Sequence, residues 1–85
     1  MKNKVLVNIS IPEIDQEFDI YLPLNKKIST ILVLLDKAIS ETHKRNFFLT
    51  KKSLLMDYEK GIKYDGDSLV KDTDIQNGSK LILLS

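Results

Sequence analysis

The stretch Ile28–Ile39, ISTILVLLDKAI, decides the fold because it is the one run whose apolar residues recur at helical spacing. Its stripe falls at positions i, i+3, i+4, i+7 and i+11 and consists of Ile28, Ile31, Leu32, Leu35 and Ile39. This spacing predicts one amphipathic helix, which starts near Asn25 or Ser29 as candidate N-caps and reaches Lys44 at the furthest. Because a single helix cannot bury such a stripe alone, the rest of the chain must supply a sheet for it to lie on.

Strands are predicted on both sides of this helix. Lys4–Ile11 and Glu17–Leu22 each alternate apolar with polar residues, and a short polar loop that begins at Pro12 joins them as a hairpin. After the helix, period-two segments predict further strands at Leu54–Tyr58, Ile62–Tyr64 and Lys80–Leu84. In the first of these we place Asp57 outward, which also turns Leu55 outward and leaves Leu54, Met56 and Tyr58 facing the core.

The last predicted strand, Lys80–Leu84, is apolar on both faces, and a central position in the sheet explains this best. Strands that flank a single helix indicate the α+β class, with a mixed β-sheet packed on that helix. The order ββαβ(β)β corresponds to the β-grasp. Eighty-five residues without repeats, linkers or low-complexity tracts form a single domain, 1–85.

Composition argues against several classes of function. Thirteen basic and twelve acidic side chains give a net charge of +1, which provides no basic surface for nucleic acid. The chain has no cysteine, so it contains no disulfide, thiolate metal site or cysteine nucleophile. The start MKNK leads into an alternating segment, and no apolar run has the length of a membrane span. We therefore expect a cytoplasmic protein without membrane insertion.

Candidate catalytic and metal-binding residues have simpler interpretations. His43 is the only histidine, and we interpret it as a solvated residue near the helix end. Asp65-Gly66-Asp67 begins an acidic loop, but the twelfth position from Asp65 is Gln76, where a calcium loop requires a bidentate Glu. We interpret these aspartates, with Asp72 and Asp74, as turn residues. No glycine-rich phosphate loop or catalytic serine motif is present, so we expect no enzyme activity, catalytic residue, metal or cofactor.

The last third of the chain resembles ubiquitin-like proteins. The resemblance lies in an apolar strand, a glycine turn, a short strand, a leucine turn and a last apolar strand, here Leu54–Met56, Gly61, Ile62, Leu69, Asp72, Ile75, Gly78 and Leu81–Leu83. Within that superfamily the chain is most similar to the small YukD-like proteins, which are encoded with type VII secretion systems of Gram-positive bacteria. The resemblance implies a β-grasp interaction protein that acts as an accessory or regulatory component of such a system.

Two alternatives to this role stay open. Conjugated ubiquitin-like proteins and sulfur carriers end in Gly-Gly, whereas this sequence ends Leu81-Ile82-Leu83-Leu84-Ser85. We therefore expect neither conjugation nor sulfur transfer, unless a longer native chain continues into Gly-Gly and makes the protein a carrier or modifier. The other alternative is an adaptor in an unrelated bacterial pathway.

The predicted alternation also suggests an interaction site on the sheet face away from the helix. There it places four apolar side chains in one exposed patch, namely Leu6, Leu55, Ile82 and Leu84. Such patches usually mark interaction sites, and we expect a protein partner, a secretion-system component, to dock here. Homodimer formation is a second interpretation. A third is that the segment 40–53, with Phe47 or Phe48, folds over the patch. Within that segment we expect one phenylalanine to close the end of the core.

Overall fold

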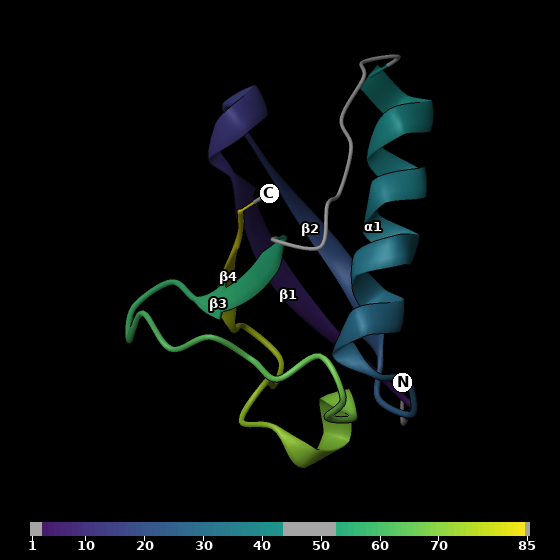
Figure 1. Cartoon of the computed structure of the whole chain (residues 1–85), viewed down its shortest axis with the longest axis vertical. Helices are drawn as coiled ribbons and strands as arrows, with labels where there is room; N and C mark the ends of the chain where they lie inside the picture. Colours follow the sequence, from purple (N-terminus) through teal and green to yellow (C-terminus); the bar gives the residue numbers. More distant parts are fainter. Residues whose placement is uncertain (1–2, 44–52, 85) are drawn as a thin grey trace.

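The computed structural model describes residues 3–43 and 53–84, apart from the side chains of residues 40, 42 and 43, and shows a sheet with one helix across it (Figure 1). The main elements are β1 (Lys4–Ile11), β2 (Gln16–Pro23), α1 (Ile28–His43), β3 (Leu54–Asp57) and β4 (Lys80–Leu84). One-turn 3-10 helices at Pro12–Ile14 and Val70–Asp72 complete the order. The expectation for Phe47 and Phe48 concerns residues outside the described ranges.

The sheet has four strands in the order β2-β1-β4-β3. β1 is antiparallel to β2 and parallel to β4, while β3 is antiparallel to β4. The last strand is therefore central, as its two apolar faces predicted. A mixed sheet of this order, packed against one helix, is the ubiquitin-like β-grasp, which confirms the predicted fold class.

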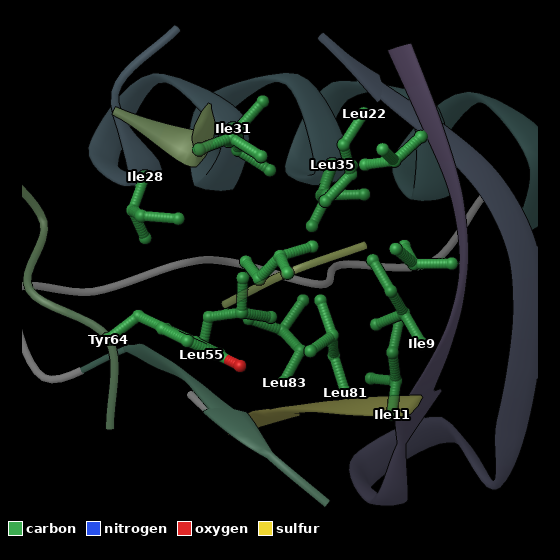
Figure 2. Close-up of a cluster of buried hydrophobic side chains, with 14 of the residues drawn as sticks. Ile9, Ile11, Leu22, Ile28, Ile31, Leu35, Leu55, Tyr64, Leu81 and Leu83 are labelled. Atoms are coloured by element: carbon green, nitrogen blue, oxygen red, sulfur yellow. The ribbon is translucent and has the colours of Figure 1, made fainter. Parts of the chain in front are cut away.

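The core lies between the sheet and α1, and Figure 2 shows side chains from both layers meeting there. On α1, the predicted stripe supplies the buried Ile28, Ile31, Leu35 and Ile39, with Leu32 half-buried at its margin. From the sheet, alternate residues of each strand point inward, the most deeply buried being Val7, Ile9, Ile11, Leu22, Leu55, Leu81 and Leu83. The helical and period-two patterns in the sequence thus identified the core residues contributed by α1, β1, β2 and β4.

The start of α1 is held by backbone groups of a distant loop. The amide of Ile28 donates to the carbonyl of Ser68 at 2.9 Å, and that of Ser29 donates to the carbonyl of Gly66 at 3.0 Å. These bonds satisfy two of the amides that the first turn of a helix leaves without an intrahelical partner. The loop after β3 therefore fixes where the helix begins.

The structure reverses the predicted orientation of β3. Leu55 is completely buried in the core, and Leu54 and Met56 turn to the opposite face of the sheet. The prediction correctly placed Leu55 and Asp57 on the same face but chose the wrong one. Asp57 ends the strand, and its Oδ1 accepts the amides of Glu59 and Lys60 at 2.8 and 2.9 Å. Because its carboxylate is hydrogen-bonded by the following turn, an aspartate can take the last inward-facing position of a strand.

The predicted short strand Ile62–Tyr64 reduces to one isolated bridge, between Lys63 and Met56. Two backbone bonds hold this segment beside β3: the amide of Asp57 donates to the carbonyl of Ile62, and the amide of Tyr64 to the carbonyl of Leu55, both at 2.9 Å. The segment therefore covers the outer edge of β3 without forming a fifth strand.

Candidate protein-interaction site

The sheet face opposite α1, here called the open face, carries an apolar cluster over its last two strands. On β4, Ile82 and Leu84 alternate with the buried Leu81 and Leu83 and so face outward. On β3, Met56 pairs with Ile82, and Leu54 pairs with Leu84. These four half-buried side chains, Leu54, Met56, Ile82 and Leu84, form what we call the β3–β4 patch.

Two of the four residues in the predicted patch lie elsewhere. Leu55 does not contribute, because it is buried on the inner face. Leu6 is on the open face and 38% exposed, but its neighbour on β2 is Tyr21, at the other end of the sheet. Along β1, Asn8 and Ser10 separate Leu6 from the β3–β4 patch, and their neighbours on β4 are Lys80 and Ile82. The structure thus brings together Ile82 and Leu84 and adds Leu54 and Met56, which the sequence had placed inward.

A polar hollow of about 390 Å³ separates the β3–β4 patch from Leu6. It is lined by Asn8, Ser10, Glu17, Asp19, Tyr58 and Lys80. The side-chain amide of Asn8 donates to Glu17 Oε1 at 3.4 Å and to Asp19 Oδ1 at 3.2 Å, which holds the two carboxylates over the sheet. The open face therefore presents an apolar cluster with a polar, partly acidic margin, the usual composition of a protein-binding surface.

A second polar group ties two loops together beside β3. The hydroxyl of Tyr64 donates to Asp74 Oδ1 at 2.8 Å, and Lys60 Nζ donates to Asp74 Oδ2 at 3.0 Å. The hydrogen bonds from Lys60 and Tyr64 lower the pKa of Asp74, and the bond to Asp74 raises the pKa of Lys60. Burial, followed by the bond to Asp74, raises the pKa of Tyr64. This arrangement ties the two loops together beside β3.

We expect Tyr64→Phe to lower the free energy of unfolding by about 1 kcal/mol at neutral pH, because it removes a partly buried hydroxyl that donates to a carboxylate. Since folding raises the pKa of Tyr64, this contribution is complete below the unfolded-state pKa of about 10 and declines as pH rises above it. Urea unfolding of wild type and Tyr64→Phe between pH 7 and about 11 measures the difference. A difference that stays constant across this range would contradict the assignment.

Two of the four aspartates considered for calcium, Asp65 and Asp74, have local hydrogen-bond partners. Asp65 Oδ1 accepts the amide of Asp67 at 2.9 Å, as in an Asx turn, and Asp74 is bound by Lys60 and Tyr64. Across residues 3–43 and 53–84, no group of three or more His, Cys, Asp or Glu side chains is arranged to hold a metal ion. Nor does any helix in those ranges combine the length and apolarity needed to cross a membrane.

Comparison with known proteins identifies the fold through solved structures. No protein-family model matches the chain, and no curated protein matches it significantly. The EccD5 ubiquitin-like domain from Mycobacterium xenopi superposes with a TM-score of 0.75 at 16% identity, over 95% of this chain and 92% of that one. The ubiquitin-like domain of the Mycobacterium tuberculosis type VII secretion protein EccD1 gives 0.72 at 19% identity, over 96% and 98%.

A third similar structure belongs to a larger assembly. A chain of the ESX-5 inner membrane complex superposes with a TM-score of 0.71 at 16% identity; the match covers 96% of this chain and 21% of that one. At these identities the likeness establishes the fold alone. The chain thus has the structure of a ubiquitin-like domain, and domains of this class occur in type VII secretion proteins.

Proposed function

We propose that this protein is a non-catalytic ubiquitin-like interaction module, which acts as a cytoplasmic accessory or regulatory component of a type VII secretion system in a Gram-positive bacterium. In this proposal the YukD-like proteins are its functional counterparts. The observation that carries the proposal is the β3–β4 patch, because four apolar side chains gathered on a sheet face that no helix or strand of the described residues covers favour a protein partner. Similarity to the EccD ubiquitin-like domains supports secretion as the setting.

The proposed mechanism is docking of the open face onto a larger secretion component. The β3–β4 patch would supply the desolvated centre of the interface, and the polar hollow with Glu17, Asp19 and Lys80 would form its rim. A partner surface that combines apolar residues with basic ones at its margin would complement this arrangement. The asymmetry also orients the partner, since the β3–β4 patch lies at one end of the open face and the polar hollow lies beside it.

Binding to the host's purified secretion membrane complex, extracted in detergent, tests this mechanism. We expect Leu84→Asp and Ile82→Asp to weaken binding about 30-fold or more, because each places a charge at the centre of the interface. Leu6→Asp is the matched control: the same change on the same face, but outside the patch. The proposal fails if folded Leu84→Asp and Ile82→Asp bind as tightly as Leu6→Asp and the wild type.

A further inference from the structure

The two edges of the sheet differ in how they are covered. The segment Ile62–Tyr64 occupies the outer edge of β3 through the backbone bonds described above. At the other end, β2 is the terminal strand of the sheet, and among the described residues no further strand pairs with it. Eight residues of β2 therefore present one open edge, the feature by which strands of separate chains pair.

The hydrogen-bond phase identifies the groups along this edge. Leu24 donates its amide to the carbonyl of Asn3 at 2.8 Å, and the β1–β2 register continues this pairing inward along the ladder. Because bonded and non-bonded pairs alternate in an antiparallel ladder, Phe18, Ile20 and Leu22 bond to β1. The amide and carbonyl groups of Glu17, Asp19 and Tyr21 consequently point away from β1, toward the open edge.

An apolar groove of about 220 Å³ runs beside this edge, between β2 and α1. Its lining comes from Ile20–Pro23 on β2 and from Ile31, Leu34, Leu35 and Ala38 on α1. On the α1 side of this groove Leu34 is 48% exposed, and on β2 Tyr21, whose side chain lies on the open face, is 52% exposed. A strand added to β2 would extend the sheet beneath the groove and cover part of both residues.

We propose that a second copy of this chain occupies the edge, so that two β2 strands pair antiparallel, with Ile20 of one copy opposite Ile20 of the other. In this register the amide of Asp19 donates to the carbonyl of Tyr21 in the other copy, and the amide of that Tyr21 donates to the carbonyl of Asp19. The symmetry repeats this pair of bonds on the other side of the axis. On the inner face, Phe18 lies opposite Leu22. The two-fold axis is perpendicular to the sheet, so both helices lie on the same side and the two grooves meet.

Several registers would let the outward-facing backbone groups of the two β2 strands bond to each other. The charges and the position of Pro23 favour the register centred on Ile20. Pairing Asp19 with Asp19 would set two carboxylates directly opposite each other, which is destabilising. Pairing Tyr21 with Tyr21 would set Asp19 against Pro23, which has no amide to donate. With Ile20 at the centre, Pro23 falls at each end of the ladder, and Asp19 lies opposite the uncharged Tyr21. The overall charge of +1 adds little repulsion between copies.

This interface is separate from the β3–β4 patch. It uses the backbone groups of β2, whereas Glu17 and Asp19 contribute only side chains to the rim of the proposed docking site. The β3–β4 patch lies on the last two strands of the sheet, whereas β2 is at the opposite edge. Self-pairing can therefore hold or fail whether or not the patch binds a secretion component, and a paired molecule would offer two patches to such a partner.

Sedimentation equilibrium of the full chain, from micromolar to near-millimolar concentration, tests the pairing. We expect the wild type to shift toward twice the chain mass as concentration rises. Asp19→Pro removes an amide that faces the open edge and should raise the dissociation constant about tenfold or more, because each dimer loses two backbone hydrogen bonds. Asp19→Asn keeps that amide and should dimerise like the wild type.

Cysteine cross-linking tests the register in a chain that has no cysteine of its own. In a non-hydrogen-bonded antiparallel pair the Cα atoms lie about 4.5 Å apart, within reach of a disulfide. Ile20→Cys should therefore cross-link rapidly under mild oxidation. Phe18→Cys, on the same strand and face, should not cross-link. In the proposed register Phe18 of each copy lies opposite Leu22 of the other, so the two new cysteines would be far apart along the ladder.

Three results would overturn the proposal. One is a wild type that remains monomeric at near-millimolar concentration. Another is Asp19→Pro, shown to be folded by circular dichroism, that dimerises like Asp19→Asn. The third is equal cross-linking of Ile20→Cys and Phe18→Cys. A monomer whose Asp19 and Tyr21 amides become protected from hydrogen exchange only when a foreign extended peptide is added would assign the edge to that peptide instead.

Discussion

Leu55→Asp should unfold the protein or lower its free energy of unfolding by more than about 4 kcal/mol. The side chain of Leu55 is completely buried beside Leu83 and Tyr64, so the new carboxylate would lie in the core without a partner (Figure 2). A domain of this size has a total stability near the low end of roughly 5–15 kcal/mol, so this single change removes most of it. Urea unfolding followed by circular dichroism measures the effect.

Met56→Asp is the matched control for this experiment. Met56 is the next residue of the same strand, but its side chain faces the open side of the sheet, where a carboxylate stays hydrated. We expect it to cost about 1 kcal/mol or less. Equal destabilisation by the two variants would show that the orientation of β3 described above is wrong. Leu55→Asp is also unsuitable as a probe of partner binding, because lost binding would only report lost folding.

Ile31→Ala should lower the free energy of unfolding by about 2–4 kcal/mol. Ile31 is 1% exposed and lies in the middle of the α1 stripe that packs on the sheet. Removing its outer carbon atoms deletes buried apolar surface and leaves a cavity that the surrounding strands close only in part. Chemical denaturation of the variant and the wild type in parallel gives the difference.

Val33→Ala tests the same helix on its outer side. Val33 is 67% exposed, and alanine has the higher helix propensity, so we expect a change within about 0.5 kcal/mol of zero. If Val33→Ala destabilised the protein as much as Ile31→Ala, the assignment of the buried face of α1 would be contradicted.

Local patterns in the sequence were sufficient to predict most of the fold. The stripe that includes Ile28 and Leu35 predicted the helix, because a period of 3.6 on an apolar face has one structural solution. The alternation from Val5 to Ile11 predicted β1 with the residue bounds observed. The two apolar faces of Lys80–Leu84 predicted a central strand. Each of these conclusions needed only the residues of one segment.

The candidate site was harder to predict because it depends on how segments align. The β1–β4 register sets Ser10 beside Ile82, and this long-range pairing, invisible in either strand alone, separates Leu6 from the patch. The orientation of β3 depended on the role of Asp57, whose carboxylate binds the following turn. The segment Asp57-Tyr58-Glu59-Lys60-Gly61 carried that signal, since an Asp that begins a glycine-containing turn often binds its own backbone.

The parallel pairing of β1 with β4 also determines the order in which the protein can assemble. The β1–β2 hairpin needs only a short loop closure and can form early, but the centre of the sheet joins residues near Asn8 to residues near Lys80. Such distant partners slow folding. During synthesis, a nascent chain that has not yet released Lys80–Leu84 from the ribosome holds a hairpin and a helix with no strand between β1 and β3. Its apolar core stays open until the final strand emerges, so it is in this interval that the growing chain is most exposed to aggregation.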